Sequence, residues 1–142
     1  MPETISSYKL SACSDEDFKN VVELIAEMQL DSNDLQPSQF IIAKSNAKLV
    51  GFGRLRTYEG CQELCSLGVI EASRNKGVGT LISQALKEKS TKPLYAVTII
   101  PGYFKRLGFE QVIDFPKEIM AKVQYCTGSL PVPETYVAMW LK

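Results

Sequence analysis

Residues 63–80 contain the residue types and spacing that could do chemistry in this chain. Gly77 and Gly79 stand at the predicted start of a helix, where glycine lets the backbone approach a ligand closely. The unpaired amides of a first helical turn, together with the helix dipole, form an anion site. Arg74 and Lys76 add positive charge beside it. Because a pyrophosphate suits several successive amides, the segment predicts a pyrophosphate-binding loop.

The two glycines are a weak signal alone, and their context gives them weight. They follow an apolar strand directly, and an amphipathic helix starts at the second glycine. The alternative is a glycine-containing loop that only joins a strand to a helix. The chain lacks the GxxxxGK[ST] pattern, and Gly77-Val78-Gly79 lacks the third glycine of a dinucleotide fingerprint. ATP and NAD are therefore disfavoured as ligands.

The chain contains no histidine, which excludes Ser-His-Asp and Cys-His catalysis and histidine-ligated metals. Catalysis must then use carboxylates, tyrosine, lysine, cysteine, backbone amides or a cofactor. Cys65 has no histidine to lower the pKa of its thiol, so core packing is predicted for it rather than a nucleophilic role. No metal is expected, because no CxxC spacing occurs among Cys13, Cys61, Cys65 and Cys126.

Length and charge restrict the class of protein further. The 142 residues suit one domain, residues 1–142. Sixteen Lys and Arg balance sixteen Asp and Glu, which argues against nucleic acid or an anionic membrane as the main partner, because both require a basic surplus. The start of the chain lacks a signal-peptide pattern, and no run approaches 18 apolar residues. We therefore expect a cytoplasmic protein.

Periodicity predicts the elements that must position the loop. Before it, we expect a strand at residues 5–12, a helix at 15–30 capped by Ser14, and a loop at 31–37. A hairpin of strands 39–44 and 47–58 around Ser45-Asn46 and a further strand at 61–70 should follow. Strand alternation would place Glu63, Cys65, Leu67 and Val69 on one face.

After the loop, the chain is predicted to alternate between helix and strand. We expect a helix from Gly77–Gly79 to Lys92-Pro93, a strand at residues 94–100 and a short helix at 101–107 closed by Gly108. A weak strand at 109–113, a proline-containing segment without an element at 114–133 and a last strand at 134–141 complete the chain. The fold class is α+β or mixed α/β.

Two blocks of this sequence resemble the GNAT superfamily of N-acetyltransferases. The first is ELCSLGVIEASRNKGVGTLI, and the second is YFKRLGFEQV at residues 103–112. The order of the elements agrees along nearly the whole chain. The resemblance implies a mixed, mostly antiparallel central sheet, flanked by helices and splayed open between the strands at 61–70 and 94–100.

The resemblance also implies which residues bind acetyl-CoA. The glycine-rich loop would cradle the pyrophosphate, and the strand before it would pair its backbone with the pantetheine arm. Phe104, at the position of the family's usual tyrosine, is counted with them. The implied cofactor-binding residues are Leu67, Gly68, Val69, Arg74, Asn75, Lys76, Gly77, Val78, Gly79, Thr80 and Phe104.

The implied reaction is direct acetyl transfer to an amine through a tetrahedral intermediate. Glu63 is the general base, because several family members carry a catalytic glutamate at that position; the alternative is a solvated strand-end residue. For the general acid we take Tyr103, with Tyr125 and Tyr136 as alternatives, or a thiolate that leaves unaided. Oxyanion stabilisation would rest on a backbone amide near Leu67.

The last third of the chain is loosely similar to the acetyltransferase domain of N-acetylglutamate synthases, on RLGFEQV, Pro116, Lys122-Val123 and Cys126. This similarity points to amino-acid-like acceptors. For substrate binding, one predicted strand face carries Phe52, Arg54, Arg56 and Tyr58, and a bidentate arginine suits a carboxylate. Cross-strand ion pairs on a solvated edge are the alternative. Lys122 is a weaker candidate.

Three functions remain open from the sequence. The first is acetyl-CoA-dependent N-acetylation of a small amine or amino acid. The second is a non-catalytic acyl-CoA-binding or regulatory module, suggested by phenylalanine at position 104. The third is a protein N-acetyltransferase. A homodimer is compatible with the proline-rich approach to the last strand, which could pair edges between two copies.

Overall fold

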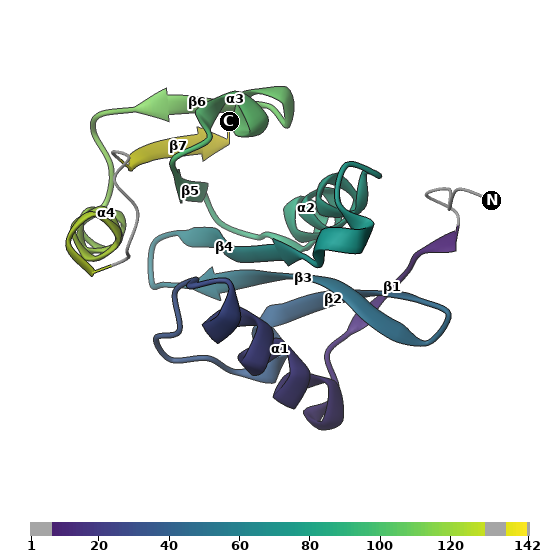
Figure 1. The fold of residues 1–142 in the computed structure, drawn as a ribbon. Helices are drawn as coiled ribbons and strands as arrows, with labels where there is room; N and C mark the ends of the chain where they lie inside the picture. Colours follow the sequence, from purple (N-terminus) through teal and green to yellow (C-terminus); the bar gives the residue numbers. More distant parts are fainter. Residues whose placement is uncertain (1–6, 130–135, 142) are drawn as a thin grey trace.

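The strands of this chain form one seven-stranded sheet in the order β1-β2-β3-β4-β5-β7-β6 (Figure 1). The computed structural model describes residues 7–129 and 136–141, and every count here refers to them. Neighbouring strands run antiparallel except β4 and β5, which run parallel. The expected mixed, mostly antiparallel sheet flanked by helices is confirmed.

The elements follow the predicted order with changed bounds. The strands are β1 (Lys9–Ala12), β2 (Phe40–Ser45), β3 (Lys48–Thr57), β4 (Gln62–Val69), β5 (Leu94–Thr98), β6 (Phe109–Val112) and β7 (Val137–Leu141). The helices are α1 (Asp15–Glu27), α2 (Val78–Lys89), α3 (Pro101–Arg106) and α4 (Lys117–Ser129), with short 3-10 turns at Pro37–Gln39 and Glu71–Ser73. The outer ends of the predicted first and last strands, residues 5–6 and 134–135, lie outside the described residues.

Ser14 begins α1 as predicted. Its hydroxyl accepts a hydrogen bond from the Asp17 amide at 3.1 Å and donates one to the Asp17 carboxylate at 2.9 Å. Val21 and Ile25 are fully buried against β2 and β3. The helix ends before the predicted residue 30, because Gln29 takes a left-handed conformation with φ of 57° and turns the chain.

The hairpin of β2 and β3 forms as predicted, with its turn one residue later. Asn46 and Ala47 occupy the turn with φ values of 52° and 64°, and Ser45 pairs with Lys48. Two left-handed residues in succession match the right-handed twist of the flanking strands. β3 is thereby placed beside β4.

β4 carries one extra residue relative to β3. Phe52 pairs with Gly68 and Arg54 with Cys65, so two steps along β3 face three along β4. Ser66 lies inside this interval with φ of 46°. A β-bulge of this kind shifts the side-chain alternation of every residue after it.

The bulge makes the predicted single face of β4 wrong. Leu64 packs in the core beneath α2, so its neighbours Glu63 and Cys65 point to the opposite face. Leu67 and Val69 pack into the α2 core as well. They lie on the face away from Glu63, because the bulge has turned the strand over.

β4 and β5 separate as expected. They pair only at Gln62 with Leu94 and at Glu63 with Tyr95, and then diverge. The sheet therefore opens into a wedge. α1 and α2 lie on opposite faces of the β1–β4 part of the sheet (Figure 1).

The helix α4 corrects the prediction for residues 114–133, which expected no element there. Pro116 precedes the helix, and its carbonyl accepts hydrogen bonds from the amides of Ile119 and Met120 at 3.0 Å. Ile119, Lys122 and Cys126 form its buried side. Proline is well tolerated at a helix start, so here it marks a beginning and not a loop. Residues 130–133 lie outside the described part.

The remaining helices agree with their sequence signals. α2 starts after Gly77 as predicted and ends at Lys89, ahead of the predicted Lys92-Pro93. Gly108 follows α3 with φ of 98°, the left-handed closure expected for it. None of the helices in the described part of the chain has the length and hydropathy that a membrane crossing requires.

Candidate active site

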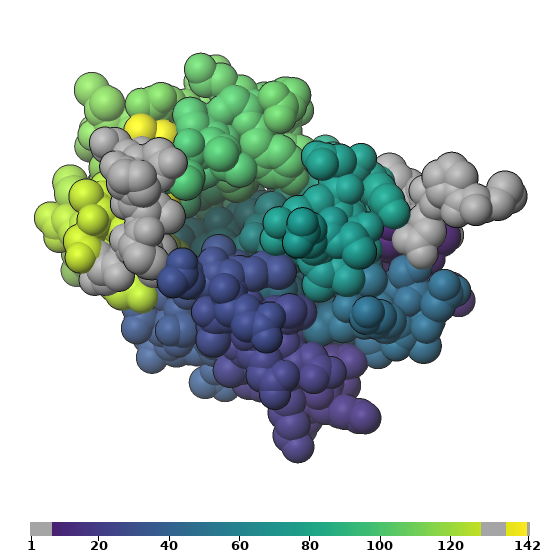
Figure 2. All heavy atoms as spheres, in the orientation of Figure 1, coloured from purple at the N-terminus to yellow at the C-terminus, as the bar shows by residue number. Residues whose placement is uncertain are grey.

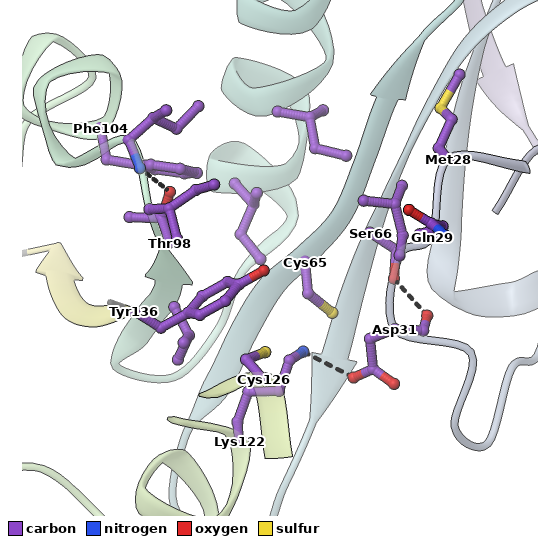
Figure 3. Close-up of a pocket in the computed structure, with 16 residues that line it drawn as sticks. Met28, Gln29, Asp31, Cys65, Ser66, Thr98, Phe104, Lys122, Cys126 and Tyr136 are labelled. Atoms are coloured by element: carbon purple, nitrogen blue, oxygen red, sulfur yellow. Dashed lines mark hydrogen bonds and ion pairs between the residues drawn. The ribbon is translucent and has the colours of Figure 1, made fainter. Parts of the chain in front are cut away.

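A cavity of about 320 Å³ lies in the wedge between β4 and β5. One wall is formed by residues 64–67 of β4 and another by residues 97–100 in and after β5. Phe104, Lys122, Cys126 and Tyr136 close it, together with residues 28–31 of the loop after α1. We call it the wedge cavity. Figure 2 shows the surface hollowed between α1, α2 and α3, and Figure 3 shows the Tyr136 hydroxyl pointing into the cavity.

The predicted pyrophosphate loop follows the end of β4. Asn75 and Gly77 are left-handed, with φ values of 63° and 84°. Gly77 caps α2 and has no side chain to accept hydrogen bonds from the first helical amides. The Arg74 guanidinium donates to the Val69 carbonyl at 2.9 Å and lies back against the strand end. These free amides and nearby cations fit a bound anion such as a pyrophosphate.

Glycine at positions 68 and 79 has different physical reasons. A Cβ atom on Gly68 would lie 2.6 Å from the Phe52 ring and 2.7 Å from the Met28 sulfur, so no side chain fits there. A Cβ atom on Gly79 would lie 3.3 Å from the Tyr103 hydroxyl. Gly68 is therefore required by packing beneath α1, while Gly79 lets the Tyr103 hydroxyl approach the first turn of α2.

A cluster of three buried charges lies at the start of β4. The Lys122 ammonium is 2.7 Å from the Asp31 carboxylate and 2.7 Å from the Glu63 carboxylate. The other Glu63 oxygen accepts a hydrogen bond from the Tyr58 hydroxyl at 2.9 Å. Glu63 is 0 % exposed. We call Asp31, Glu63 and Lys122 the carboxylate–lysine cluster; Figure 3 shows its Asp31–Lys122 pair beside the wedge cavity.

Charge and burial shift the pKa values around this cluster. Burial alone would lower the pKa of Lys122, but the Glu63 and Asp31 carboxylates raise it above its ordinary value. Burial alone would raise the pKa of Asp31, and Lys122 lowers it below its ordinary value. Burial, followed by the charge of Glu63, raises the pKa of Cys65 to about 12. The Cys65 thiol therefore stays protonated at neutral pH, as its predicted packing role requires.

A second cavity of about 370 Å³ adjoins the wedge cavity at the Asp31–Lys122 pair. Both of those residues line it as well as the wedge cavity. We call it the side cavity. Its remaining lining residues are Asn33, Asp34, Arg56, Tyr58, Glu118, Ala121 and Tyr125.

The two predicted substrate arginines lie in different environments. Arg54 is 0 % exposed, and its guanidinium donates to Gln39 and to the carbonyls of Asn33 and Asp34. Arg54 lines neither cavity. Arg56 lines the side cavity, 2.9 Å from the Asp34 carboxylate. The structure thus brings only Arg56 to a cavity surface.

The predicted tyrosines also separate. The Tyr103 hydroxyl lies 3.4 Å from the Ser83 hydroxyl, at the start of α2 and outside both cavity linings. Its neighbour Phe104 lines the wedge cavity. Tyr136 lines the wedge cavity and Tyr125 the side cavity.

Sequence reasoning did not single out Asp31 for the site, it placed Tyr58 only on the strand face of Arg54 and Arg56, and it ranked Lys122 low. Lys122 had a usable signal, because it lies between Ile119 and Cys126 at helical spacing, where a buried lysine needs acidic partners. Asp31 had none, since its role depends on a loop whose shape no local pattern determines.

No group of three or more cysteine or acidic side chains in the described ranges is arranged to hold a metal ion. The site is built instead from carboxylates, a lysine, tyrosines and main-chain amides.

Comparison with known proteins places the chain among acetyltransferases. The family model of the acetyltransferase (GNAT) domain matches residues 36–111. An uncharacterized N-acetyltransferase of Chlorobaculum tepidum is 29 % identical over 102 residues, which span 67 % of this chain and 66 % of that protein. The match thus covers slightly less than two thirds of that relative's length.

Solved structures share the fold at low sequence identity. N-acetylglutamate synthase from Neisseria gonorrhoeae, complexed with coenzyme A and N-acetyl-glutamate, superposes with a TM-score of 0.76 and 14 % identity over 94 % of this chain and 34 % of that chain. Arabidopsis thaliana Naa50, in complex with the bisubstrate analogue CoA-Ac-MVNAL, gives 0.71 and 17 % identity over 96 % and 99 %. The present chain spans about a third of the Neisseria synthase.

Proposed function

This chain belongs to the GNAT family of acetyltransferases, and we propose that it transfers an acetyl group from acetyl-CoA to the nitrogen of a small amine or amino acid. The wedge cavity carries this proposal. β4 runs from the carboxylate–lysine cluster, along the cavity wall, to the loop at residues 74–80. One strand thereby links an anion-binding loop to a buried base, with an open cavity between them.

We assign the donor side of the reaction to the loop and to β4. Acetyl-CoA, when bound, supplies the activated acetyl thioester. The α2 amides with Asn75, Arg74 and Lys76 hold its pyrophosphate, residues 67–69 lie along the pantetheine arm, and Phe104 packs beside it. The coenzyme A complexes of similar folds support this assignment.

We assign proton handling to one carboxylate and one tyrosine. Glu63 takes a proton from the acceptor ammonium, since an amine must be neutral to attack. Tyr136 donates to the departing thiolate in place of Tyr103, because Tyr136 lines the wedge cavity and Tyr103 does not. The amide near Leu67 orients the acyl oxygen.

The side cavity is our choice for the acceptor. Arg56 is paired there with Asp34, whose side chain is 80 % exposed, so an acceptor carboxylate can take that place on the guanidinium. Arg54 supports the same loop from beneath through the Asn33 and Asp34 carbonyls. An amino acid acceptor agrees with the similarity to N-acetylglutamate synthase, whereas Naa50 with its peptide analogue favours a peptide N-terminus as second candidate.

The test is acetylation of a panel of amino acids, amines and short peptides, followed by mass spectrometry because the thiols would react with a thiol dye. We expect turnover of at least one small acceptor. Glu63→Gln should lower turnover by roughly 10²- to 10⁴-fold and leave acetyl-CoA binding unchanged. Exposed Glu71, changed to Gln, is the matched control.

Acetyl-CoA binding without turnover of any acceptor would reduce the protein to an acyl-CoA-binding module. Turnover of peptides alone would favour the protein-acetylating function.

A further inference from the structure

Glu63 has no open path to an acceptor. It is 0 % exposed and lines neither cavity. One of its oxygens meets the Lys122 ammonium, and the other meets the Tyr58 hydroxyl. Any proton that reaches Glu63 in this conformation must pass through one of these two groups.

Lys122 cannot serve as that path. Its ammonium already carries its full set of protons, and two carboxylates hold it at 2.7 Å. The surrounding negative charge raises the pKa of Lys122 above its ordinary value, against the effect of burial. A group that stays protonated cannot accept another proton. Lys122 instead fixes the orientation of the Glu63 carboxylate.

Tyr58 has the lone pair that the Lys122 ammonium lacks. Its side chain lines the side cavity, and its hydroxyl donates to Glu63 at 2.9 Å. A hydroxyl oxygen keeps lone pairs that can accept a proton while its own proton leaves. The Arg56 guanidinium lies over the same ring, 5.3 Å from the centroid. Arg56 and Tyr58 thus line the same cavity side by side, so a carboxylate held by Arg56 would bind beside Tyr58.

We propose that Tyr58 relays the proton from the acceptor ammonium in the side cavity to Glu63. This inference rests on the proposed acetyltransferase function. One N–H proton moves to the Tyr58 oxygen as the Tyr58 proton moves to Glu63, so the tyrosine ends neutral and Glu63 ends protonated. The freed nitrogen lone pair attacks the acetyl carbonyl, and the C–S bond breaks. The departing thiolate takes the Tyr136 proton, the second N–H proton restores the Tyr136 hydroxyl, and the proton on Glu63 returns to solvent by the same route.

The concerted form of this relay follows from the environment of Tyr58. Burial, then the charge of Glu63, raises the pKa of the Tyr58 hydroxyl above its ordinary value. A free phenolate is therefore disfavoured, and the two protons move together.

The titratable groups around the relay are Lys122 and Cys126 from α4, Cys65 from β4, Cys61 from the turn before β4 and Asp31 from the loop after α1, and Arg54 and Arg56 add positive charge. The pKa of Asp31 is lowered and those of Lys122 and the thiols are raised, so these five groups keep their protonation state across the neutral range. Burial raises the thiol pKa values, to about 12 for Cys65 and about 11 for Cys126. The pH dependence in this range therefore reports the relay and the acceptor.

The experiment compares wild-type protein and Tyr58→Phe with two acceptors of similar shape, one with an amine pKa above the assay pH and one below it. For the first, we expect Tyr58→Phe to lower kcat by roughly 10²-fold or more, the usual worth of general base catalysis, while acetyl-CoA affinity stays constant. For the second, which arrives already deprotonated, the loss should be much smaller. Raising the pH should reduce the loss for the first acceptor. Tyr95→Phe removes a hydroxyl that lines neither cavity and should change nothing.

A loss equal for both acceptors, or no loss at all, would overturn the relay. Rates in mixtures of H₂O and D₂O test wild-type protein alone, in case Tyr58→Phe does not fold. Two protons in flight give a curved dependence on deuterium content, and a straight line contradicts the proposal. If wild-type protein turns over no acceptor, the proposed function fails and the relay falls with it. Turnover without these effects of Tyr58→Phe would contradict the relay and leave the proposed acetyltransferase function standing.

Discussion

Lys122 pairs a single ammonium with two buried carboxylates. Removing one partner from a buried charge cluster typically costs about 3–5 kcal/mol, because the remaining charges lose their compensation. We expect Lys122→Met to lower the free energy of unfolding by that order, measured by urea denaturation. Lys122→Met combined with Glu63→Leu should recover part of the loss, because an apolar pair can replace a buried ion pair. No recovery in the double variant would mean that packing, and not charge, dominates at this position.

The residue types predicted Glu63 and the glycine-rich loop, but only the structure shows which side chains surround Glu63. The glutamate and the glycine-rich loop lie on a strand and a helix whose periodicity is visible in the sequence. Tyr58 meets Glu63 across the short turn between β3 and β4, whereas Asp31 reaches the cluster from the loop after α1 and only through Lys122. The long-range placement of Asp31 leaves no local pattern.

Elements with a strong local signal were predicted well. The serine cap of α1, the glycine start of α2 and the left-handed Gly108 each have one physical cause, and each is confirmed. α4 was missed because Pro116 precedes it and Gly128 lies in its last turn, and both residue types resemble loop punctuation. The β4 bulge was missed because Ser66 is not a residue type that favours a left-handed conformation.

The left-handed Gly77 sets the entry of α2 and gives a prediction for the element. Alanine at a φ of 84° is strained by about 1–2 kcal/mol, so Gly77→Ala should reorient the first amides of the helix. We expect acetyl-CoA to bind roughly tenfold more weakly, as that energy implies, measured by calorimetry. Gly60→Ala is the matched control, since a Cβ atom there meets nothing within 4 Å. Equal affinity in the two variants would argue against an anion at the helix start.

The sheet as a whole opens between β4 and β5, and the ion pairs of the carboxylate–lysine cluster connect its two parts. Lys122 on α4, which packs against β5 and β7, joins Glu63 on β4 to the loop after α1. The stability of the whole molecule should therefore depend on the charge state of this cluster.

Acid should weaken the molecule through Asp31. Its folded pKa is below the model-compound value of 3.8, so its contribution is present above that pH and is lost as the pH falls through the lower folded value. Between about pH 4 and pH 2, the free energy of unfolding should fall more steeply for wild-type protein than for Asp31→Asn. Denaturant titrations across this range measure both slopes. Parallel slopes would show that Lys122 does not lower the pKa of Asp31 in the folded protein.

The extra residue in β4 also restricts how this chain can change length. Deleting Ser66 would let β3 and β4 pair without interruption, but Leu67 and Val69 would then leave the α2 core, because alternation has a period of two. Gly68 would also leave its place beside Phe52 and Met28, and no residue larger than glycine could fill that place. Insertions and deletions should therefore be rejected within β4. A library built to alter acceptor choice should keep the length of β4 constant.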